Sequence, residues 1–285
     1  MSEHDNPSQT ADTTDTRPDT PLVWDHLRTV RRQLRVADGL LFGTDFDGTL
    51  SPIEEDPEAP EPTAENLRSL RTLRDHPQVR PAVISGRGLA DLRERVGIEG
   101  VDYVGNHGLE LGIDGRRETH PDAAVAEPKI EEICNELGRR LADIEGTVVE
   151  NKGVTATIHY RMVDREEVET VREHVFDAVA ERGDDEVEIH DGKESLELRP
   201  AADWDKGSAI AQLQEHVDGW QPLYIGDDTT DEAAFEAITP NGITVHVGDR
   251  ETVADYRVRS PAEAEVFVRW LVTDGLTLLE REPAA

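Results

Sequence analysis

The sequence is short of cysteine, lysine and long apolar runs. Cys134 is the single cysteine among 285 residues, so no disulfide can form within the chain. No apolar run approaches the roughly 18 residues that a membrane-spanning helix requires. The first twenty residues are rich in Asp, Thr and Pro and carry no apolar stretch, which argues against a signal peptide. We therefore expect residues 1–21 to form a disordered acidic tail, and the protein to be cytoplasmic with no membrane partner.

Positive charge is scarce, and lysine supplies little of it. The chain has 62 acidic and 30 basic residues, a formal net charge of −32, and only four lysines. A balance this acidic argues against nucleic acid as a partner, because the phosphates would repel it. Many Asp and Glu with few Lys is a composition that we associate with salt-loving organisms, in which concentrated salt screens self-repulsion. The alternative is an ordinary acidic protein.

The most informative stretch is Asp45-Phe46-Asp47-Gly48-Thr49-Leu50, which follows an apolar run expected to form a buried strand at 39–45. An unpaired carboxylate is costly to bury, so Asp45 and Asp47 must face water, a cation or a substrate. Two Asp residues at this spacing, taken alone, also fit a strand followed by a turn. The full hexapeptide resembles motif I of the haloacid dehalogenase superfamily, whose phosphatases and phosphotransferases work through an aspartyl phosphate.

Strands and helices alternate in the first and last parts of the chain. Strands are expected at 39–45, 79–84, 101–104, 222–225 and 242–247, and helices at 22–37, 63–74, 88–96, 205–217 and 263–271. This alternation predicts an α/β fold, a doubly wound parallel sheet with helices on both faces. Ligands of such sheets bind at the carboxyl ends of the strands, where Asp45, Ser85, Asn106 and Asp227 are predicted to lie.

The pattern changes between residues 111 and 199. Helices are expected at 128–144 and 164–180, and strands at 147–149, 154–161, 186–190 and 194–199. This αββαββ order predicts a small sheet with two helices on one face. We therefore expect a core domain of residues 22–110 and 200–285, with residues 111–199 inserted as a cap domain.

The residues at the strand ends suit phosphoryl transfer. Asp45 would attack phosphorus, and Asp47 would protonate the leaving alcohol and later deprotonate water. Because carboxylates and a phosphate repel one another at close range, Lys206 and a hard cation such as Mg²⁺ would offset the charge. In order along the chain, these residues resemble the four motifs of the superfamily. The predicted site residues are Asp45, Asp47 and Lys206 for catalysis, Asp45, Asp47, Asp227 and Asp231 for metal, and Thr49, Ser85, Gly86 and Arg87 for phosphate.

Further motifs are similar to those of trehalose-6-phosphate phosphatases. They are residues 106–110 (NHGLE), 150–153 (ENKG), 159–161 (HYR) and 196–200 (LELRP). The resemblance implies a cap that covers the sugar, whose hydroxyls need many polar partners. It assigns substrate contacts to Asn106, His107, Glu150, Lys152, His159, Arg161 and Glu197. The alternative for His159 and Arg161 is that they form only the outward face of a cap strand.

The resemblance implies Mg²⁺-dependent hydrolysis of trehalose 6-phosphate to trehalose and phosphate. The implied partners are the small-molecule sugar phosphate and, as a candidate, a trehalose-6-phosphate synthase. A different capped sugar phosphatase, acting on sucrose phosphate or mannosyl-3-phosphoglycerate, is the enzymatic alternative. The second alternative is a phosphatase-like module that binds a partner without catalysis. A binding role does not require Asp45, Asp47, Lys206 and Asp227 together, which weighs against this alternative.

Overall fold

The computed structural model describes residues 20–53, 60–183 and 185–279. The tail expected at residues 1–21 lies almost entirely outside this part of the chain. None of the helices in the described ranges combines the length and the apolar composition that crossing a bilayer takes.

The larger sheet has eight strands in the order β12-β11-β10-β1-β2-β3-β4-β5. Its parallel strands are β1 (Leu40–Thr44), β2 (Val79–Ile84), β3 (Asp102–Gly105), β10 (Gln221–Gly226), β11 (Ile243–Val247) and β12 (Tyr256–Val258). β1 is buried along its whole length and lies between β2 and β10, where the strand order reverses. The predicted parallel sheet is confirmed, and the carboxyl end of β1 is the position at which such sheets bind ligands.

Two antiparallel strands, β4 (Glu110–Ile113) and β5 (Arg116–Thr119), extend the sheet beyond β3. The boundary expected at residues 110 and 111 therefore falls inside β4, and the core sheet continues to Thr119. A turn of Asp114 and Gly115, both with positive φ, joins the two strands. Asp-Gly is a typical hairpin turn, so the sequence did carry a signal for this pair of strands. β12 was also not predicted, because three residues are too few to show a periodicity.

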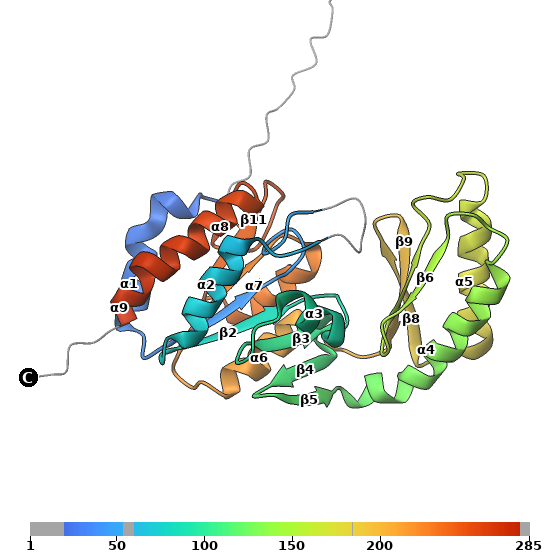
Figure 1. Cartoon of the computed structure of the whole chain (residues 1–285), viewed down its shortest axis with the longest axis horizontal. Coiled ribbons are helices and arrows are strands. Elements are labelled where there is room, and N and C mark those ends of the chain that lie inside the picture. The colour runs from blue at the N-terminus through green and yellow to red at the C-terminus, as the bar shows by residue number, and fades with distance from the viewer. Residues whose placement is uncertain (1–19, 54–59, 184, 280–285) are drawn as a thin grey trace, which may run out of the picture.

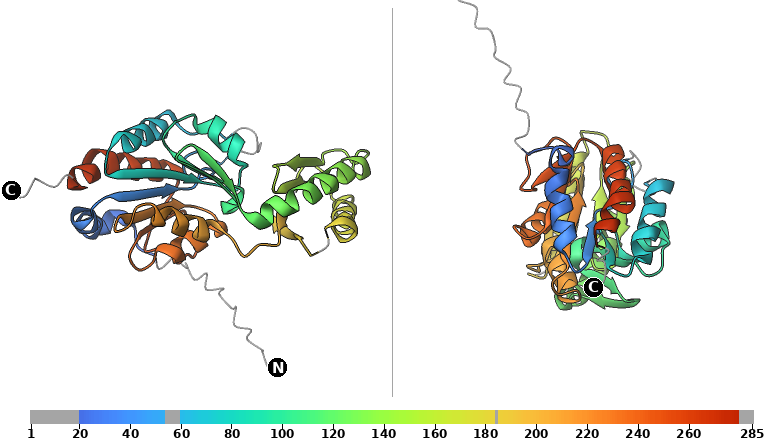
Figure 2. Two further views of the ribbon diagram at one scale, coloured as in Figure 1. Left: turned by 90° about the horizontal axis from the view of Figure 1, so that it is seen from below. Right: turned by 90° about the vertical axis from the view of Figure 1, so that its left-hand side faces the viewer.

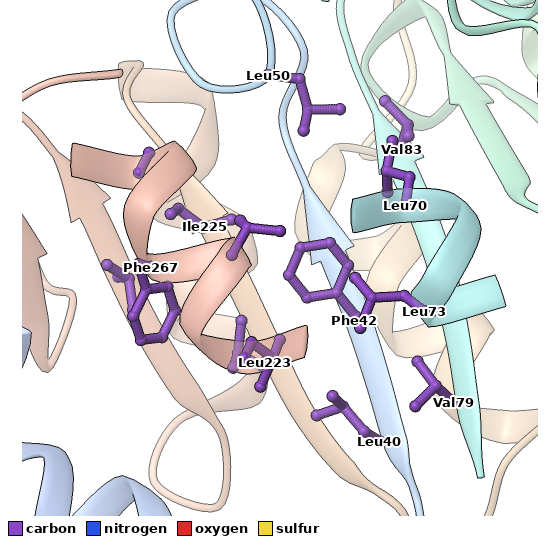
Figure 3. Packing of buried hydrophobic residues seen from close by; sticks show 14 of the residues in the cluster. Leu40, Phe42, Leu50, Leu70, Leu73, Val79, Val83, Leu223, Ile225 and Phe267 are labelled. Atoms are coloured by element: carbon purple, nitrogen blue, oxygen red, sulfur yellow. The ribbon is translucent and has the colours of Figure 1, made fainter. Parts of the chain in front are cut away.

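Helices cover both faces of this sheet (Figure 2). One face packs against η1 (Val23–His26), α1 (Leu27–Val36), α2 (Ala64–Asp75), α3 (Leu89–Val96), α8 (Pro261–Trp270), η4 (Leu271–Gly275) and α9 (Leu276–Leu279). The other packs against α6 (Lys206–Glu215), η3 (Thr229–Asp231) and α7 (Glu232–Ile238). Figure 3 shows Phe42 of β1 and Leu223 of β10 between Leu73 of α2 and Phe267 of α8. Burial of these side chains fixes the strands that hold the site.

The cap consists of α4 (Pro121–Arg140), β6 (Val148–Asn151), β7 (Ala156–His159), α5 (Val168–Arg182), β8 (Val187–Gly192) and β9 (Ser195–Pro200). Its antiparallel sheet has the order β6-β7-β9-β8 and lies between its two helices and the core (Figure 1). The cap has its own apolar cluster, which includes Ile133, Val175 and Leu198. α4 begins at Pro121 instead of Pro128, because Pro121 also suits the first turn of a helix.

Candidate active site

Asp45 and Lys206 form the floor of the site. Asp45 follows β1 and Lys206 begins α6, and only 4% and 2% of the two residues are exposed. Lys206 Nζ donates to Asp45 Oδ1 at 2.9 Å and to Asp231 Oδ1 at 2.7 Å. Burial alone lowers the pKa of Lys206, but Asp231 and Asp45 outweigh it and raise that pKa above its ordinary value. Lys206 is therefore a permanent cation beside Asp45.

Asp231 is held by three donors. In addition to Lys206, the Tyr224 hydroxyl donates to Oδ1 at 2.7 Å, and the backbone N–H of Asp228 donates to Oδ2 at 2.9 Å. Asp231 and Tyr224 are both fully buried. Asp231 thus has a fixed orientation from which it positions Lys206.

Three carboxylates could hold a metal ion. Oxygens of Asp45, Asp227 and Asp231 all lie within 4.8 Å of one another. Burial and the charge of Asp231 raise the pKa of Asp227 to about 7. Burial also raises the pKa of Asp45, and the charges of Asp231 and Asp227 add to this shift, whereas Lys206 opposes it. A hard oxygen set that carries this much mutual repulsion fits Mg²⁺. Asp47, the fourth predicted ligand, is not part of this group among the described residues.

Gly48 and Thr49 bring motif I against Asp227. Gly48 has φ +74°, and a Cβ at this position would lie 2.2 Å from Asp227 Oδ2. Only glycine tolerates both the conformation and the close approach. The hydroxyl of the buried Thr49 donates to Asp227 Oδ1 at 3.4 Å. Thr49 does not line the pocket described below, and its assignment to the phosphate stays a prediction.

Asp47 pairs with Arg87 instead. Nε and Nη2 of Arg87 donate to the two carboxylate oxygens of Asp47, each at 2.8 Å. The buried Ser85 hydroxyl accepts from the backbone N–H of Arg87 at 3.2 Å. Gly86 lies against the ring of His107, which a Cβ would approach to 2.4 Å. The SGR turn after β2 thus lies beside Asp45 and Asp47 in one pocket, at the strand end where the sequence predicts it.

Side chains from the cap close the same pocket, which has a volume of about 310 Å³. The residues that line it are Asp45, Asp47, Ile53, Ser85, Gly86, Arg87, His107, Glu150, Lys152, His159, Glu197, Lys206, Asp227, Asp228 and Thr230. His159 Nε2 lies 2.9 Å from Glu150 Oε2, and Lys152 Nζ lies 3.7 Å from the same atom. His159 therefore faces the pocket and is more than an outward-facing strand residue.

His107 connects the core to β9. Arg199 Nη2 lies 3.0 Å from His107 Nε2, and Glu197 Oε2 lies 3.5 Å from that nitrogen. Because arginine can only donate, Nε2 must accept and the imidazole is neutral. Burial lowers the pKa of His107 to about 4, with the charge of Arg199 adding to the shift and Glu197 opposing it. Arg199 Nε also donates to Glu197 Oε2 at 2.9 Å, so Arg199 fixes both neighbours.

Two predicted substrate contacts do not line the pocket. Asn106 is fully buried, and its amide bonds to Glu110, Thr155 and the carbonyl of Lys152. Arg161 donates to Glu194 at 3.1 Å from a partly exposed position. The residue motifs are present, but these two side chains have protein partners elsewhere.

Sequence reasoning did not single out Tyr224, Thr230 or Arg199. Arg199 was detectable, since it lies two residues after Glu197 and such residues share one face of a strand. Tyr224 carried no signal, because it occupies an apolar position in a strand whose burial explains it equally well.

A family model described as trehalose-phosphatase matches residues 43–266. A trehalose-phosphate phosphatase of Mycobacterium marinum is 40% identical over 245 residues, which cover 82% of this chain and 62% of that protein. The C-terminal domain of C. albicans trehalose-6-phosphate phosphatase superposes with a TM-score of 0.73 at 25% identity, covering 90% of this chain and 98% of that one. A haloacid dehalogenase-like hydrolase from B. subtilis, at 16% identity and a TM-score of 0.51, covers 82% and 99% and shares the fold.

The chain spans somewhat under two thirds of the length of the mycobacterial relative. The family match runs from β1 to α8 and so includes the floor of the site, the cap and the residues after β10. These findings confirm the resemblance drawn from the motifs: the chain is a member of the trehalose-phosphatase family.

Proposed function

We propose that this chain hydrolyses trehalose 6-phosphate to trehalose and phosphate with the help of Mg²⁺. One observation carries the proposal. A single pocket joins residues suited to phosphoryl transfer, Asp45 and Lys206, to polar side chains of the facing cap, such as Glu150 and Glu197. Its volume of about 310 Å³ is of the size found for small-molecule sites.

The first half of the reaction forms an aspartyl phosphate. A carboxylate oxygen of Asp45 attacks phosphorus, and the bond between phosphorus and the sugar oxygen breaks. Asp47, which takes up a proton from water in the second half of each cycle, gives a proton to that sugar oxygen, which leaves as a hydroxyl. Lys206 holds Asp45 through a 2.9 Å hydrogen bond and offsets its charge. Arg87 holds the carboxylate of Asp47 in a fixed orientation.

The second half releases phosphate. A water attacks phosphorus, Asp47 takes a proton from it, and the bond between phosphorus and Asp45 breaks. Asp45, Asp227 and Asp231 would hold Mg²⁺, which supplies positive charge opposite the phosphate oxygens. Ser85 and the backbone near Gly86 lie beside the pocket and are suited to hold these oxygens.

The cap supplies contacts that phosphoryl transfer does not need. Carboxylates of Glu150 and Glu197 can accept hydrogen bonds from sugar hydroxyls, and Lys152 and His159 can donate them. The proposed specificity therefore lies in the cap sheet and the proposed chemistry in the core. A cytoplasmic location and association with a synthase stay predictions from the sequence.

The test is phosphate release from a panel of sugar phosphates, with Mg²⁺ and with a chelator. We expect the highest kcat/KM for trehalose 6-phosphate, loss of activity with the chelator, and recovery on adding Mg²⁺. Preference for sucrose phosphate or mannosyl-3-phosphoglycerate would reassign the substrate. No release from any member of the panel would favour a binding module.

A further inference from the structure

Two consecutive residues of the core, Asn106 and His107, each contact a different hairpin of the cap. They open η2 (Asn106–Gly108), directly after β3, with φ values of +49° and +58°. Left-handed backbone is unfavourable for residues other than glycine, so surrounding contacts must hold it in place. His107 contacts Arg199 of β9, and Asn106 contacts the turn between β6 and β7.

The side-chain amide of Asn106 forms hydrogen bonds to three protein groups. Its Nδ2 donates to Glu110 Oε2 at 2.7 Å and to the carbonyl oxygen of Lys152 at 3.3 Å. Its Oδ1 accepts from Thr155 Oγ1 at 2.6 Å. Asn106 is fully buried and Thr155 is 4% exposed, so these bonds are shielded from water. A polar group that loses its partner in such a place is costly.

The turn that Asn106 contacts is itself closed by hydrogen bonds. The backbone N–H of Lys152 donates to the carbonyl of Thr155 at 2.9 Å, and Gly153 N–H donates to Asn151 Oδ1 at 2.9 Å. Val154, at the tip, is fully buried against Leu109 of the core. A displacement of Thr155 would therefore carry Lys152 with it, and with Lys152 the neighbouring Glu150.

We infer that Asn106 and Thr155 are positioning residues that set the distance between the phosphate site and the sugar contacts of the β6–β7 hairpin. This inference rests on the proposed function. It replaces the sugar contact that the sequence assigns to Asn106 with a hydrogen bond between core and cap. Neither side chain lines the pocket, so both act through Glu150 and Lys152.

The inference predicts a defect confined to the disaccharide. Thr155→Val keeps the branched shape but removes the hydroxyl, whereas Thr155→Ser keeps the hydroxyl. We expect Thr155→Val to raise KM for trehalose 6-phosphate about tenfold, because Lys152 and Glu150 would no longer be held at the distance that the sugar requires, with kcat changed less. Turnover of p-nitrophenyl phosphate, which reaches little of the cap, should stay within about twofold, and Thr155→Ser should restore the wild-type KM.

Equal losses on both substrates, or an unchanged KM for trehalose 6-phosphate, would overturn the inference. Thr155→Ala, which introduces no new contact, takes the place of Thr155→Val if the latter does not fold. Hydrogen exchange gives a readout without substrate: amides of residues 150–155 should exchange faster in Thr155→Val, while those of β1 do not change. If the wild-type chain released no phosphate from trehalose 6-phosphate, the proposed function would fail. The exchange data alone would then decide whether Thr155 holds the turn, and unchanged exchange rates for residues 150–155 would reject this role.

Discussion

The guanidinium of Arg87 holds both carboxylate oxygens of Asp47, with Nε and Nη2 each 2.8 Å from its oxygen. The same guanidinium lies over the ring of Phe46, 5.4 Å from its centre. A two-point contact of this kind fixes the plane of the carboxylate as well as its distance. Arg87, predicted as a phosphate contact, is therefore also placed to orient the proposed acid and base.

Replacing Arg87 by lysine should slow turnover of every substrate. Lysine keeps the charge but cannot make the two parallel bonds. We expect kcat to fall about 10- to 100-fold on both trehalose 6-phosphate and p-nitrophenyl phosphate, since the shared step would be impaired. Arg80→Lys is the matched control, because Arg80 of β2 also bonds to two carboxylates, those of Asp102 and Asp114, and does not line the pocket. A defect seen with only one substrate would contradict this role.

Asp45→Asn should abolish turnover and leave the fold intact, because asparagine has a similar size but no anionic nucleophile. Acid quenching during turnover, followed by intact-mass measurement, should detect a phosphoryl adduct on the wild-type chain and none on the variant. Asp47→Asn should be slower by roughly 10²–10⁴-fold through loss of acid and base assistance. Normal turnover by Asp45→Asn would reject the aspartyl-phosphate mechanism.

Local sequence carried most of the fold and the floor of the site. Strands were predictable because apolar runs end in polar residues, which placed Asp45, Ser85 and Asp227 at one edge of the sheet. The start of the helix expected at 63–74 was equally local, because the Thr63 hydroxyl caps this helix by accepting from the N–H of Asn66 at 3.1 Å. Glu110–Ile113 was not predicted as a strand, because four residues show little periodicity and only the Asp114-Gly115 turn that follows indicates a hairpin.

Side-chain pairing over long separations was not predictable. Asp47 and Arg87 are 40 residues apart, and Thr155 and Asn106 are 49 apart. Sequence motifs gave the residue types at these positions but not which polar group satisfies which. The sequence therefore assigned Asp47 to the metal and Asn106 to the sugar without showing that these side chains bond to Arg87 and Thr155.

His107 should make stability depend on pH. Its folded pKa of about 4 lies below the ordinary value of 6.5, because burial disfavours the charged ring. Between these values the unfolded chain takes up a proton that the folded chain does not, so the free energy of unfolding falls as pH falls from 6.5 to 4. The stabilisation lost should be on the order of 3 kcal/mol. Urea unfolding of the wild type and His107→Gln at several pH values tests this. If the two free energies of unfolding differed by the same amount at every pH, the prediction would be refuted.

Salt should stabilise the protein. With 62 acidic and 30 basic residues, self-repulsion weakens the folded state unless ions screen it. We expect the melting temperature to rise from low to molar KCl. Potassium sulfate and chloride compared at equal ionic strength separate screening from ion-specific effects. A flat or falling curve would remove the interpretation of the composition as salt adaptation and leave the enzymatic proposal untouched.

The cap should decide the substrate. Glu197 and Lys152 line the pocket, yet neither takes part in the proposed phosphoryl steps. A charge-assisted hydrogen bond to a sugar hydroxyl contributes roughly 1.5–3 kcal/mol, and about 1.4 kcal/mol corresponds to tenfold. We therefore expect Glu197→Ala and Lys152→Ala each to lower kcat/KM for trehalose 6-phosphate about 10- to 100-fold. Activity on p-nitrophenyl phosphate should barely change.

Arg161→Ala provides the comparison for these two variants. The sequence motif assigns Arg161 to the sugar, whereas in the structure it donates to Glu194 at 3.1 Å and does not line the pocket. The geometry predicts normal kcat/KM on both substrates for this variant. Equal losses on both substrates in Glu197→Ala and Lys152→Ala would make those residues structural, because a sugar contact cannot affect an ester that lacks the sugar. If both variants retained full activity on trehalose 6-phosphate, these cap residues would not bind the disaccharide. A different sugar phosphate would then have to be the substrate.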